Sequence, residues 1–306
     1  MPEPIVVWHF TDGKPGHDNQ TAGLLAALRD RVSVDSHRLQ TQSCRLSPVS
    51  FITRHIAFAQ DLPDPDLIIG AGHATHLRML AARRARGGRA IVLMKPTLPT
   101  GLFDLCIIPA HDGPPAKDNI LVTRGVLNRV RNSPDKDAGA GLILVGGPSA
   151  HVDWSSEDII RQIRSIVEHT PGVNWTLTTS RRTPADFMDM LTGFAAGQPA
   201  VVPAAETTSG WLPERLARAS QVWVSEDSVS MVYEALTSGA AVGLLSVPWR
   251  KSADRLASGI RVLLRDGLVT GFDGWQESAE LRRPAESFDE AGRCADWILE
   301  RWPVNS

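Results

Sequence analysis

The chain has 306 residues, of which 42% are hydrophobic and 22% charged, and its formal net charge is −2. This length exceeds one ordinary hydrophobic core and predicts two domains, and the composition is that of a globular protein. The near-neutral charge argues against a dedicated nucleic-acid binder, which usually carries a basic excess.

The three cysteines, Cys44, Cys106 and Cys294, are scattered and lack C-x-x-C spacing, which argues against a disulfide framework or a zinc site. The N-terminus has no basic segment before its apolar run, and no stretch approaches 18 consecutive apolar residues. We therefore expect no secretory signal, no transmembrane segment and a cytoplasmic location.

Short apolar runs alternate with stretches of helical periodicity along nearly the whole chain. In the first half, the expected strands are residues 5–10, 32–39, 67–70, 90–94, 105–109 and 120–123. The helices expected between them are residues 19–30, 49–60 and 75–86. Because these strands are continuously apolar rather than alternating, both of their faces should be covered by helices, as in a parallel sheet.

The second half repeats this order. Its expected strands are residues 142–145, 175–179, 200–202, 222–225 and 241–245, and its expected helices are residues 156–169, 184–195, 212–219, 229–238 and 253–265. The sequence therefore predicts an α/β protein with two Rossmann-like, doubly wound parallel sheets.

The polar segment "NSPDKDAGAG" (132–141) has the composition of a linker, and residues 270–287 form a second irregular stretch. We expect an N-terminal domain at 1–135 and a C-terminal domain at 136–306. A final amphipathic helix, at about 288–302, should pack back on the first domain.

The stretch "TDGKPGHDNQ" follows the first expected strand, where parallel α/β sheets bind their ligands. Gly13 and Gly16 allow a close backbone approach, Lys14 suits an anion, and His17 suits a general base because its ordinary pKa lies near neutrality. Asp18 could cap the next helix. The alternative is a capped, solvated turn without a functional role.

Three later loops of the first half carry similar groups. "GAGHATH" offers His73 and Thr75 as polar ligand contacts, while His73 and His76 lack the third ligand that a metal site needs. Lys95 follows a buried strand and could contact an acceptor or an inter-domain carboxylate, with a surface position as the alternative. His111 follows the next strand and could also contact an acceptor.

In the second half, "GGPSAHVDW" places Gly147 and Ser149 after a strand, and "TTSRRTP" does the same with Ser180, Arg181 and Arg182. Glycines, hydroxyls and arginines suit phosphate oxygens, although a helix cap with exposed arginines is the alternative. Neither G-x-x-x-x-G-K nor G-x-G-x-x-G occurs, which argues against a P-loop and against NAD binding.

The segment "SEDSVSMVYEAL" follows another expected strand and enters a helix. Small residues at the helix entrance, Ser225, Asp227 and Ser228, leave its N–H groups open to a diphosphate. Glu234, further along the helix, could accept both hydroxyls of a ribose; the alternative is an ordinary exposed glutamate.

The pattern S-x-D-S-x-x-x-x-x-E-A-L-x-x-G-x-x-V resembles the donor-site helix of GT-B glycosyltransferases and UDP-sugar 2-epimerases. In those enzymes two Rossmann-like domains face each other across a cleft, and the second domain holds the nucleotide sugar. The resemblance implies that Glu234 binds ribose, that Ser228 and Ser149 lie near the diphosphate, and that His17 is on the acceptor side.

A closer resemblance covers almost the whole chain and combines "DGKPGHDNQTAGL", "MKP", "GGPSAHVDW", "TTSRRTP" and "SEDSVSMVYEAL". Together these motifs look like the family of the plant mitochondrial-fission factor "elongated mitochondria" and its bacterial relatives, which are often labelled nucleoside-diphosphate-sugar epimerases. The high ratio of arginine to lysine and the lack of a targeting segment favour a bacterial member. The plant member is regarded as an adaptor, so the resemblance leaves catalysis open.

The leading hypothesis is a metal-independent glycosyltransferase whose nucleotide-sugar donor binds the C-terminal domain. His17 would be the base, steered by Asp12 or Asp18 and assisted by Lys14, and no D-x-D element or cofactor is expected. An epimerase or hydrolase acting on the same sugar, and a non-catalytic adaptor, are the alternatives. The expected partners are a nucleotide sugar and an unknown acceptor, and no nucleic acid is expected. Trp249 or Trp275 could line an acceptor groove or a groove in peripheral contact with a membrane, although an isolated tryptophan is more often part of the core.

Overall fold

The computed structural model describes residues 3–47, 50–191, 199–208, 210–278 and 280–303. The chain divides into two compact units: unit 1 comprises Met1–Arg129 and Glu290–Ser306, and unit 2 comprises Val130–Asp289. The division thus falls six residues before the expected boundary at 135, and the last helix is counted with the first unit.

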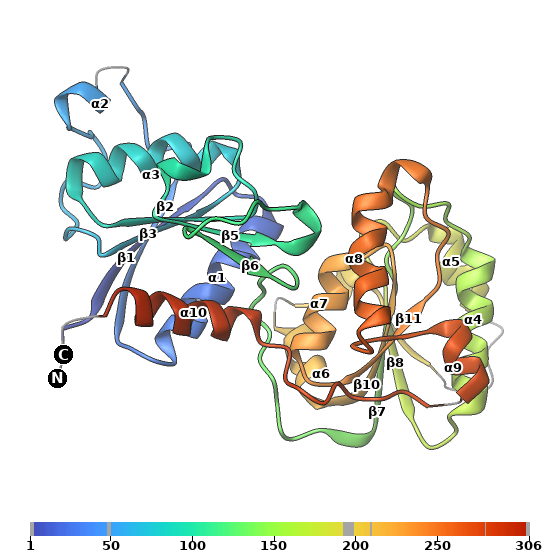
Figure 1. Ribbon diagram of the computed structural model, residues 1–306. Helices are drawn as coiled ribbons and strands as arrows, with labels where there is room; N and C mark the ends of the chain where they lie inside the picture. The colour runs from blue at the N-terminus through green and yellow to red at the C-terminus, as the bar shows by residue number, and fades with distance from the viewer. Residues whose placement is uncertain (1–2, 48–49, 192–198, 209, 279, 304–306) are drawn as a thin grey trace. The chain divides into compact units, whose positions relative to one another are not determined.

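Unit 1 is built on a six-stranded parallel sheet of order β2-β1-β3-β4-β5-β6 (Figure 1). Its strands are β1 (Ile5–Thr11), β2 (Val34–Gln40), β3 (Leu67–Ala71), β4 (Arg89–Leu93), β5 (Leu105–Pro109) and β6 (Ile120–Thr123). The strand order changes direction between β1 and β3, because β2 lies on one side of β1 and β3 to β6 follow on the other. The loops after β1 and β3 therefore leave the sheet on opposite sides of this switch point.

Helices cover both faces of this sheet, as the apolar strands require. Successive residues of β1 face opposite sides of the sheet. Val7 packs in the core that includes α1 (Pro15–Arg29) and α10 (Glu290–Arg301). Trp8 packs in the core on the other face, which includes α3 (His73–Arg86). Figure 1 shows α10 beside α1, which it contacts, with α3 on the opposite face.

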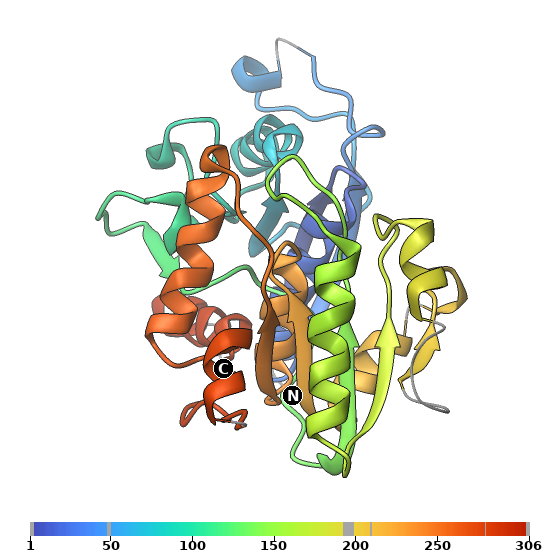
Figure 2. The ribbon, with the colours of Figure 1, turned by 90° about the vertical axis from the view of Figure 1, so that its right-hand side faces the viewer.

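Unit 2 has a second six-stranded parallel sheet, of order β12-β11-β10-β7-β8-β9. Its strands are β7 (Asp137–Leu144), β8 (Asn174–Thr178), β9 (Ala200–Val202), β10 (Ala219–Ser225), β11 (Ala241–Leu245) and β12 (Thr270–Gly271). The helices are α4 (Ser156–His169), α5 (Ala185–Met190), α6 (Trp211–Arg218), α7 (Val229–Thr237), α8 (Asp254–Arg265) and α9 (Phe272–Ser278). In Figure 2, α4 lies over one face of this sheet, and its apolar side packs with Trp175 and Trp223.

Several element boundaries differ from the sequence-based expectations. Helix α1 begins at Pro15 rather than at residue 19, because proline is well suited to the first helical position and its missing N–H leaves no bond unmade. The linker interpretation of 132–141 is wrong for Asp137 onward, which pairs in β7. The stretch 270–287, expected to be irregular, contains β12 and α9.

The helix expected over residues 49–60 is reduced to α2 (Ser50–Thr53). The backbone turns left-handed at Arg54 (φ 55°) and again at Ala59 (φ 57°), which ends the helical path despite the apolar periodicity. No helix in the described part of the chain is long and apolar enough to cross a bilayer.

Candidate functional site

His17 lies in the first turn of α1 and faces the carboxylate of Asp12, at the end of β1. Its Nδ1 is 3.0 Å from both Asp12 carboxylate oxygens. The Asp12 side chain is 5% exposed and the His17 side chain 17%, so the carboxylate is enclosed while the imidazole remains accessible. A carboxylate on Nδ1 holds the ring in one orientation and favours the proton on Nδ1, which leaves Nε2 as the acceptor.

Gly72, in the loop between β3 and α3, packs directly against this His17–Asp12 pair. A Cβ added at Gly72 would lie 2.5 Å from His17 Nδ1 and 3.0 Å from Asp12 Oδ2, and Gly72 has φ 85°. Two conditions therefore require glycine here, the left-handed backbone and the missing side chain. The loops after β1 and β3 meet at one edge of the sheet and enclose the pair.

Asp18 does not cap α1, contrary to the expectation. Its carboxylate accepts hydrogen bonds from the Thr11 hydroxyl and from Arg38 Nη2, the latter at 2.8 Å. Lys14 is the N-cap residue, and its backbone N–H donates to Asp12 Oδ1 at 3.2 Å while its side chain is exposed. Asp12 rather than Asp18 is therefore the carboxylate that orients His17.

The two expected glycines of this loop are both open. No atom lies within 4 Å of a Cβ built at Gly13 or Gly16, and Gly13 has φ 79°. The backbone of this loop is thus accessible to an approaching ligand, and Gly13 meets a conformational requirement as well.

The other residues expected on the acceptor side differ in their surroundings. His73 is exposed at the start of α3, whereas Thr75 is fully buried and its hydroxyl donates to the Gly72 carbonyl at 2.8 Å. Lys95 Nζ donates to the Asp112 carbonyl at 3.1 Å, and His111 Nε2 lies 3.8 Å from Asp112 Oδ1. Thr75 thus shapes the Gly72 loop rather than facing a ligand. Among the described residues, no three His, Cys, Asp or Glu side chains are grouped so as to hold a metal ion.

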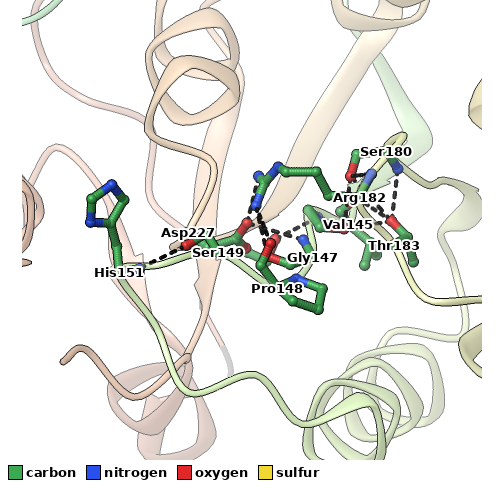
Figure 3. A network of polar contacts seen from close by, with 11 residues as sticks. Val145, Gly147, Pro148, Ser149, His151, Ser180, Arg182, Thr183 and Asp227 are labelled. Carbon is green, nitrogen blue, oxygen red and sulfur yellow. Dashed lines mark hydrogen bonds and ion pairs between the residues drawn. The ribbon is translucent and has the colours of Figure 1, made fainter.

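In unit 2, the loop after β7 is held by side chains from two neighbouring strands (Figure 3). The Gly146 N–H donates to Ser225 Oγ at 2.7 Å and the Gly147 N–H to Asp227 Oδ2 at 3.1 Å. Ser180 Oγ donates to the Gly146 carbonyl at 2.9 Å. The loops after β7, β8 and β10 therefore form one connected structure at the carboxyl edge of the sheet.

Arg182 is the cation at the centre of these connected loops after β7, β8 and β10. Its guanidinium donates to Asp227 Oδ2 at 2.8 Å and to the carbonyls of Gly147 and Pro148 at 2.7 and 3.3 Å. Figure 3 shows the guanidinium between Asp227 and this loop. Arg182 is thus bound to the protein although its side chain is 41% exposed, and Arg181 beside it is exposed as well.

The side chain of Asp227 is fully buried, and its Oδ1 has no hydrogen-bond partner among the described residues. Gly146 passes so close that a Cβ there would be 2.5 Å from Oδ1. A buried carboxylate oxygen left in this way is destabilising, because it loses its hydration without gaining a donor. The Arg182 charge is the compensation that the structure provides.

The remaining expected contacts lie around the N-terminus of α7. Ser228 is the N-cap residue but makes no side-chain capping bond, so the first N–H groups of the helix have no cap from it. Glu234 is half-buried in the second turn of α7, and Ser149 Oγ accepts the His151 N–H at 3.2 Å. Ser225 is fully buried and supports Gly146, so it is placed to shape the loop rather than to meet a ligand.

Glu226 is a residue of this edge that the sequence analysis did not single out. It is 8% exposed and its Oε2 accepts a hydrogen bond from Trp249 Nε1 at 2.9 Å. Burial raises the pKa of Glu226 to about 6, against the hydrogen bonds from Trp249 and the Val247 backbone, which lower it. Its position inside "SEDS" was the available signal, but only the fold shows that its side chain is buried beside Trp249.

The family model described as "Mitochondrial fission ELM1" matches residues 15–302. No curated protein matches the chain.

Among solved structures, a proposed UDP-N-acetylglucosamine 2-epimerase from Listeria monocytogenes has 14% identity and a TM-score of 0.60, with 97% of this chain and 95% of that chain covered. A UDP-GlcNAc 2-epimerase from Neisseria meningitidis, bound to UDP-GlcNAc, has 11% identity and a TM-score of 0.53, covering 99% and 100%. A glycotransferase of kitacinnamycin has 13% identity and a TM-score of 0.50, covering 99% and 100%. At these identities the likeness shows the fold alone, and it confirms the prediction of a GT-B-like α/β fold with two Rossmann-like units.

Proposed function

The chain belongs to the mitochondrial fission ELM1 family, and from this premise we propose that it is a nucleotide-sugar-dependent glycosyltransferase. The single observation that carries the proposal is the Asp12–His17 pair at the carboxyl edge of unit 1, an imidazole oriented by an enclosed carboxylate. A purely structural turn has no need of such a pair. The donor would be a nucleoside-diphosphate sugar bound by unit 2.

The donor half rests on the loop after β7 and the start of α7. Gly147 and Ser149 would let the backbone approach the diphosphate, and the uncapped N–H groups after Ser228 would donate to it. Exposed Arg181 would add a charge, while Arg182 would keep the loop in place through Asp227. Glu234 would accept the ribose hydroxyls. The neighbour from Neisseria meningitidis, which was solved with UDP-GlcNAc, supports a nucleotide sugar as the ligand of this fold.

The acceptor half rests on His17. An acceptor hydroxyl would lose its proton to His17 Nε2 as its oxygen bonds to the anomeric carbon of the donor. The bond between that carbon and the diphosphate oxygen would break, and the diphosphate would leave with the electron pair. Negative charge grows on the leaving group, so each preorganised donor at α7 would lower the barrier by about 3–4 kcal/mol. Asp12 would stabilise the imidazolium that forms.

The second candidate function is that of a binding protein without catalysis, because Arg182, the cation bound to the loop after β7, is already paired within the protein. Arg182 has a buried carboxylate partner and two carbonyl partners, and so has less to offer a diphosphate. On this reading the unit binds a nucleotide weakly or not at all, and the family's role in mitochondrial fission would be carried by protein contacts.

Nucleotide binding and turnover separate these functions. UDP, GDP, dTDP and CMP are titrated calorimetrically into the protein and into Glu234→Ala, with exposed Glu214→Ala on α6 as the matched control. We expect one nucleotide to bind, with an affinity loss of about 10-fold or more in Glu234→Ala alone, since a hydrogen bond to a charged group contributes about 1.5–3 kcal/mol. His17→Gln should keep this affinity and lose turnover. If no nucleotide binds, the proposal of a transferase is refuted.

A further inference from the structure

A pocket of about 420 Å³ lies within unit 1, between α1 and the edge strand β2. The polar and apolar groups that matter for its chemistry are His9, Asp18, Asn19, Leu25, Arg38 and Arg129. Its volume is within the range of about 300–1,000 Å³ that small-molecule sites occupy. The Asp12–His17 pair lies toward Gly72 and the loop after β3, so this pocket is on the other side of the α1 N-terminus.

The sheet and the close packing of one segment position the lining residues. His9 on β1 and Arg38 on β2 are register partners, and both point to the face covered by α1. Gly23 of α1 packs so tightly on the Asn128 carbonyl that a side chain there would collide with it. The chain is therefore fixed just before Arg129, whose Nε donates to Asn19 Oδ1 at 3.2 Å.

The pocket carries a net positive charge. Arg38 is neutralised by Asp18 at 2.8 Å. Arg129 is exposed and has no carboxylate partner in the described part of the chain. One guanidinium is thus available to an anion, and its planar fork suits the two oxygens of a carboxylate or phosphate.

His9 adds a neutral hydrogen-bonding group. Burial, reinforced by the charge of Arg38, lowers the pKa of His9 to about 4, so the imidazole is uncharged at neutral pH. Its Nδ1 is enclosed and has no hydrogen-bond partner among the described residues, and no hydrogen bond to Nε2 is found there either. Because Nδ1 is closed to solvent, Nε2 is the ring nitrogen with which a ligand hydroxyl in the pocket could form a hydrogen bond.

We propose that this pocket binds a small hydroxylated acid, whose phosphate or carboxylate pairs with Arg129 and whose hydroxyls contact His9 and Asn19. We further propose that this acid is the acceptor, a step that rests on the proposed transferase function. The pocket is lined by Asp18, the residue after His17, and by Gly13 and Pro15 of the same turn. An acid held here by its charged end would therefore extend along the turn that carries the base.

The test is calorimetric titration of the full-length protein with glucose 6-phosphate, with glucuronate and with uncharged glucose, at one fixed ionic strength because exposed charges are screened by salt. Arg129→Gln is compared with Arg45→Gln, an exposed arginine of unit 1 outside the pocket. We expect saturable binding of one or both acids and none of glucose, about 10-fold weaker in Arg129→Gln and unchanged in Arg45→Gln. The two acids distinguish a phosphate ester from a carboxylate as the bound group.

UDP is titrated into the same three proteins, and its affinity should not change with Arg129. If neither acid binds, or if both bind Arg129→Gln as tightly as the wild type, the pocket assignment is wrong even where UDP binds normally. If an acid binds as expected while no nucleotide does, the transferase function fails and the pocket stands. If the acid and the nucleotide both bind, but the acid is not glycosylated while the protein turns over a nucleotide-sugar donor, the acceptor role is refuted.

Discussion

Glu226 and Asp227 are adjacent carboxylates that the fold treats in opposite ways. Glu226 is buried with Trp249 and the Val247 backbone as its donors, and burial raises its pKa to about 6. Asp227 is buried as well but lies against the guanidinium of Arg182. One residue is enough to change the environment here, because the chain turns directly after β10 and gives the two side chains different partners.

The Glu226→Gln variant should become more stable than the wild type as the pH rises. The folded-state pKa of Glu226, about 6, exceeds its ordinary value of 4.5, so the carboxyl stabilises the fold below pH 4.5 and loses that contribution as the pH rises through 6. The loss is on the order of 2 kcal/mol, and glutamine, which keeps the acceptor for Trp249, does not titrate. The stability difference between the two proteins is measured from their urea-unfolding midpoints at pH values from 4.5 to 7.5. If this difference stays constant across the range, the raised pKa of Glu226 is contradicted.

The Asp12→Asn variant should reduce glycosyl transfer by about 10²–10⁴-fold, the usual scale of general-base catalysis, with little change in nucleotide affinity. The amide keeps the shape of the carboxylate but removes the charge that stabilises the imidazolium. Asp35→Asn is the matched control, because Asp35 lies 3.2 Å from His37 in an exposed pair of the same kind on β2. Initial rates and UDP affinities of the three proteins are the measurement, and equal rates in Asp12→Asn and Asp35→Asn would remove the pair from the mechanism.

At the scale of elements, α3 is bounded by two glycines with the same backbone requirement and different surroundings. Gly72 at its N-terminus has φ 85° and touches His17 and Asp12, while Gly87 at its C-terminus has φ 80° and no atom within 4 Å of an added Cβ. The two ends of one helix thus provide an internal comparison between backbone strain and steric conflict.

Gly87→Ala should cost about 1–3 kcal/mol of unfolding free energy, the strain of an alanine held at φ 80° and ψ −153°, a conformation that is essentially restricted to glycine. Gly72→Ala should lose a larger unfolding free energy than Gly87→Ala, since its methyl group also displaces His17. It should abolish glycosyl transfer, whereas Gly87→Ala should keep the wild-type transfer activity. Thermal unfolding and transfer rates of both variants are compared. A Gly72→Ala protein with the stability and rate of Gly87→Ala would show that the loop after β3 yields without disturbing the pair.

The strands were predictable because continuous apolar runs have few other uses: residues 105–109, 120–123, 200–202 and 241–245 match their strands in full. The helix expected over 49–60 failed because periodicity does not reveal a left-handed turn at Arg54. For the site, topology places the chemically capable loops at the carboxyl edges of the sheets. It does not select the partners: Arg182 and Asp227 are 45 residues apart, and Asp18 was as plausible a partner of His17 as Asp12 until the contacts were known.

At the scale of the whole molecule, both ends of the chain build unit 1. The apolar side of α10 packs with α1 and β1 through Cys294, Ala295 and Ile298. Glu290, 2% exposed at its start, accepts hydrogen bonds from the backbone and side chain of Arg124 and from Arg293. Burial alone would raise the pKa of Glu290, but these bonds and the charge of Arg293 hold it below its ordinary value.

Glu290→Gln should destabilise unit 1 by about 1.5–3 kcal/mol, because a buried charged acceptor of several hydrogen bonds is replaced by a neutral one. Unit 2 should be unaffected, since it contains none of these groups. Hydrogen exchange followed by mass spectrometry reports the two units separately, with exposed Glu300→Gln on the same helix as the control. Equal loss of protection in both units would show that α10 stabilises the molecule as a whole instead.

The position of α10 at the end of the chain, after the residues of unit 2, also affects how unit 1 folds during translation. Ribosomes release a domain to fold from its N-terminus onward, at about 5–20 residues per second. Here the first 129 residues emerge with the α10-facing side of their hydrophobic core uncovered, and the covering helix is translated only after the 160 residues of unit 2, some 10–30 seconds later. The N-terminal half of this protein is thus completed last, and nascent chains spend that interval exposing apolar surface to which a chaperone can bind.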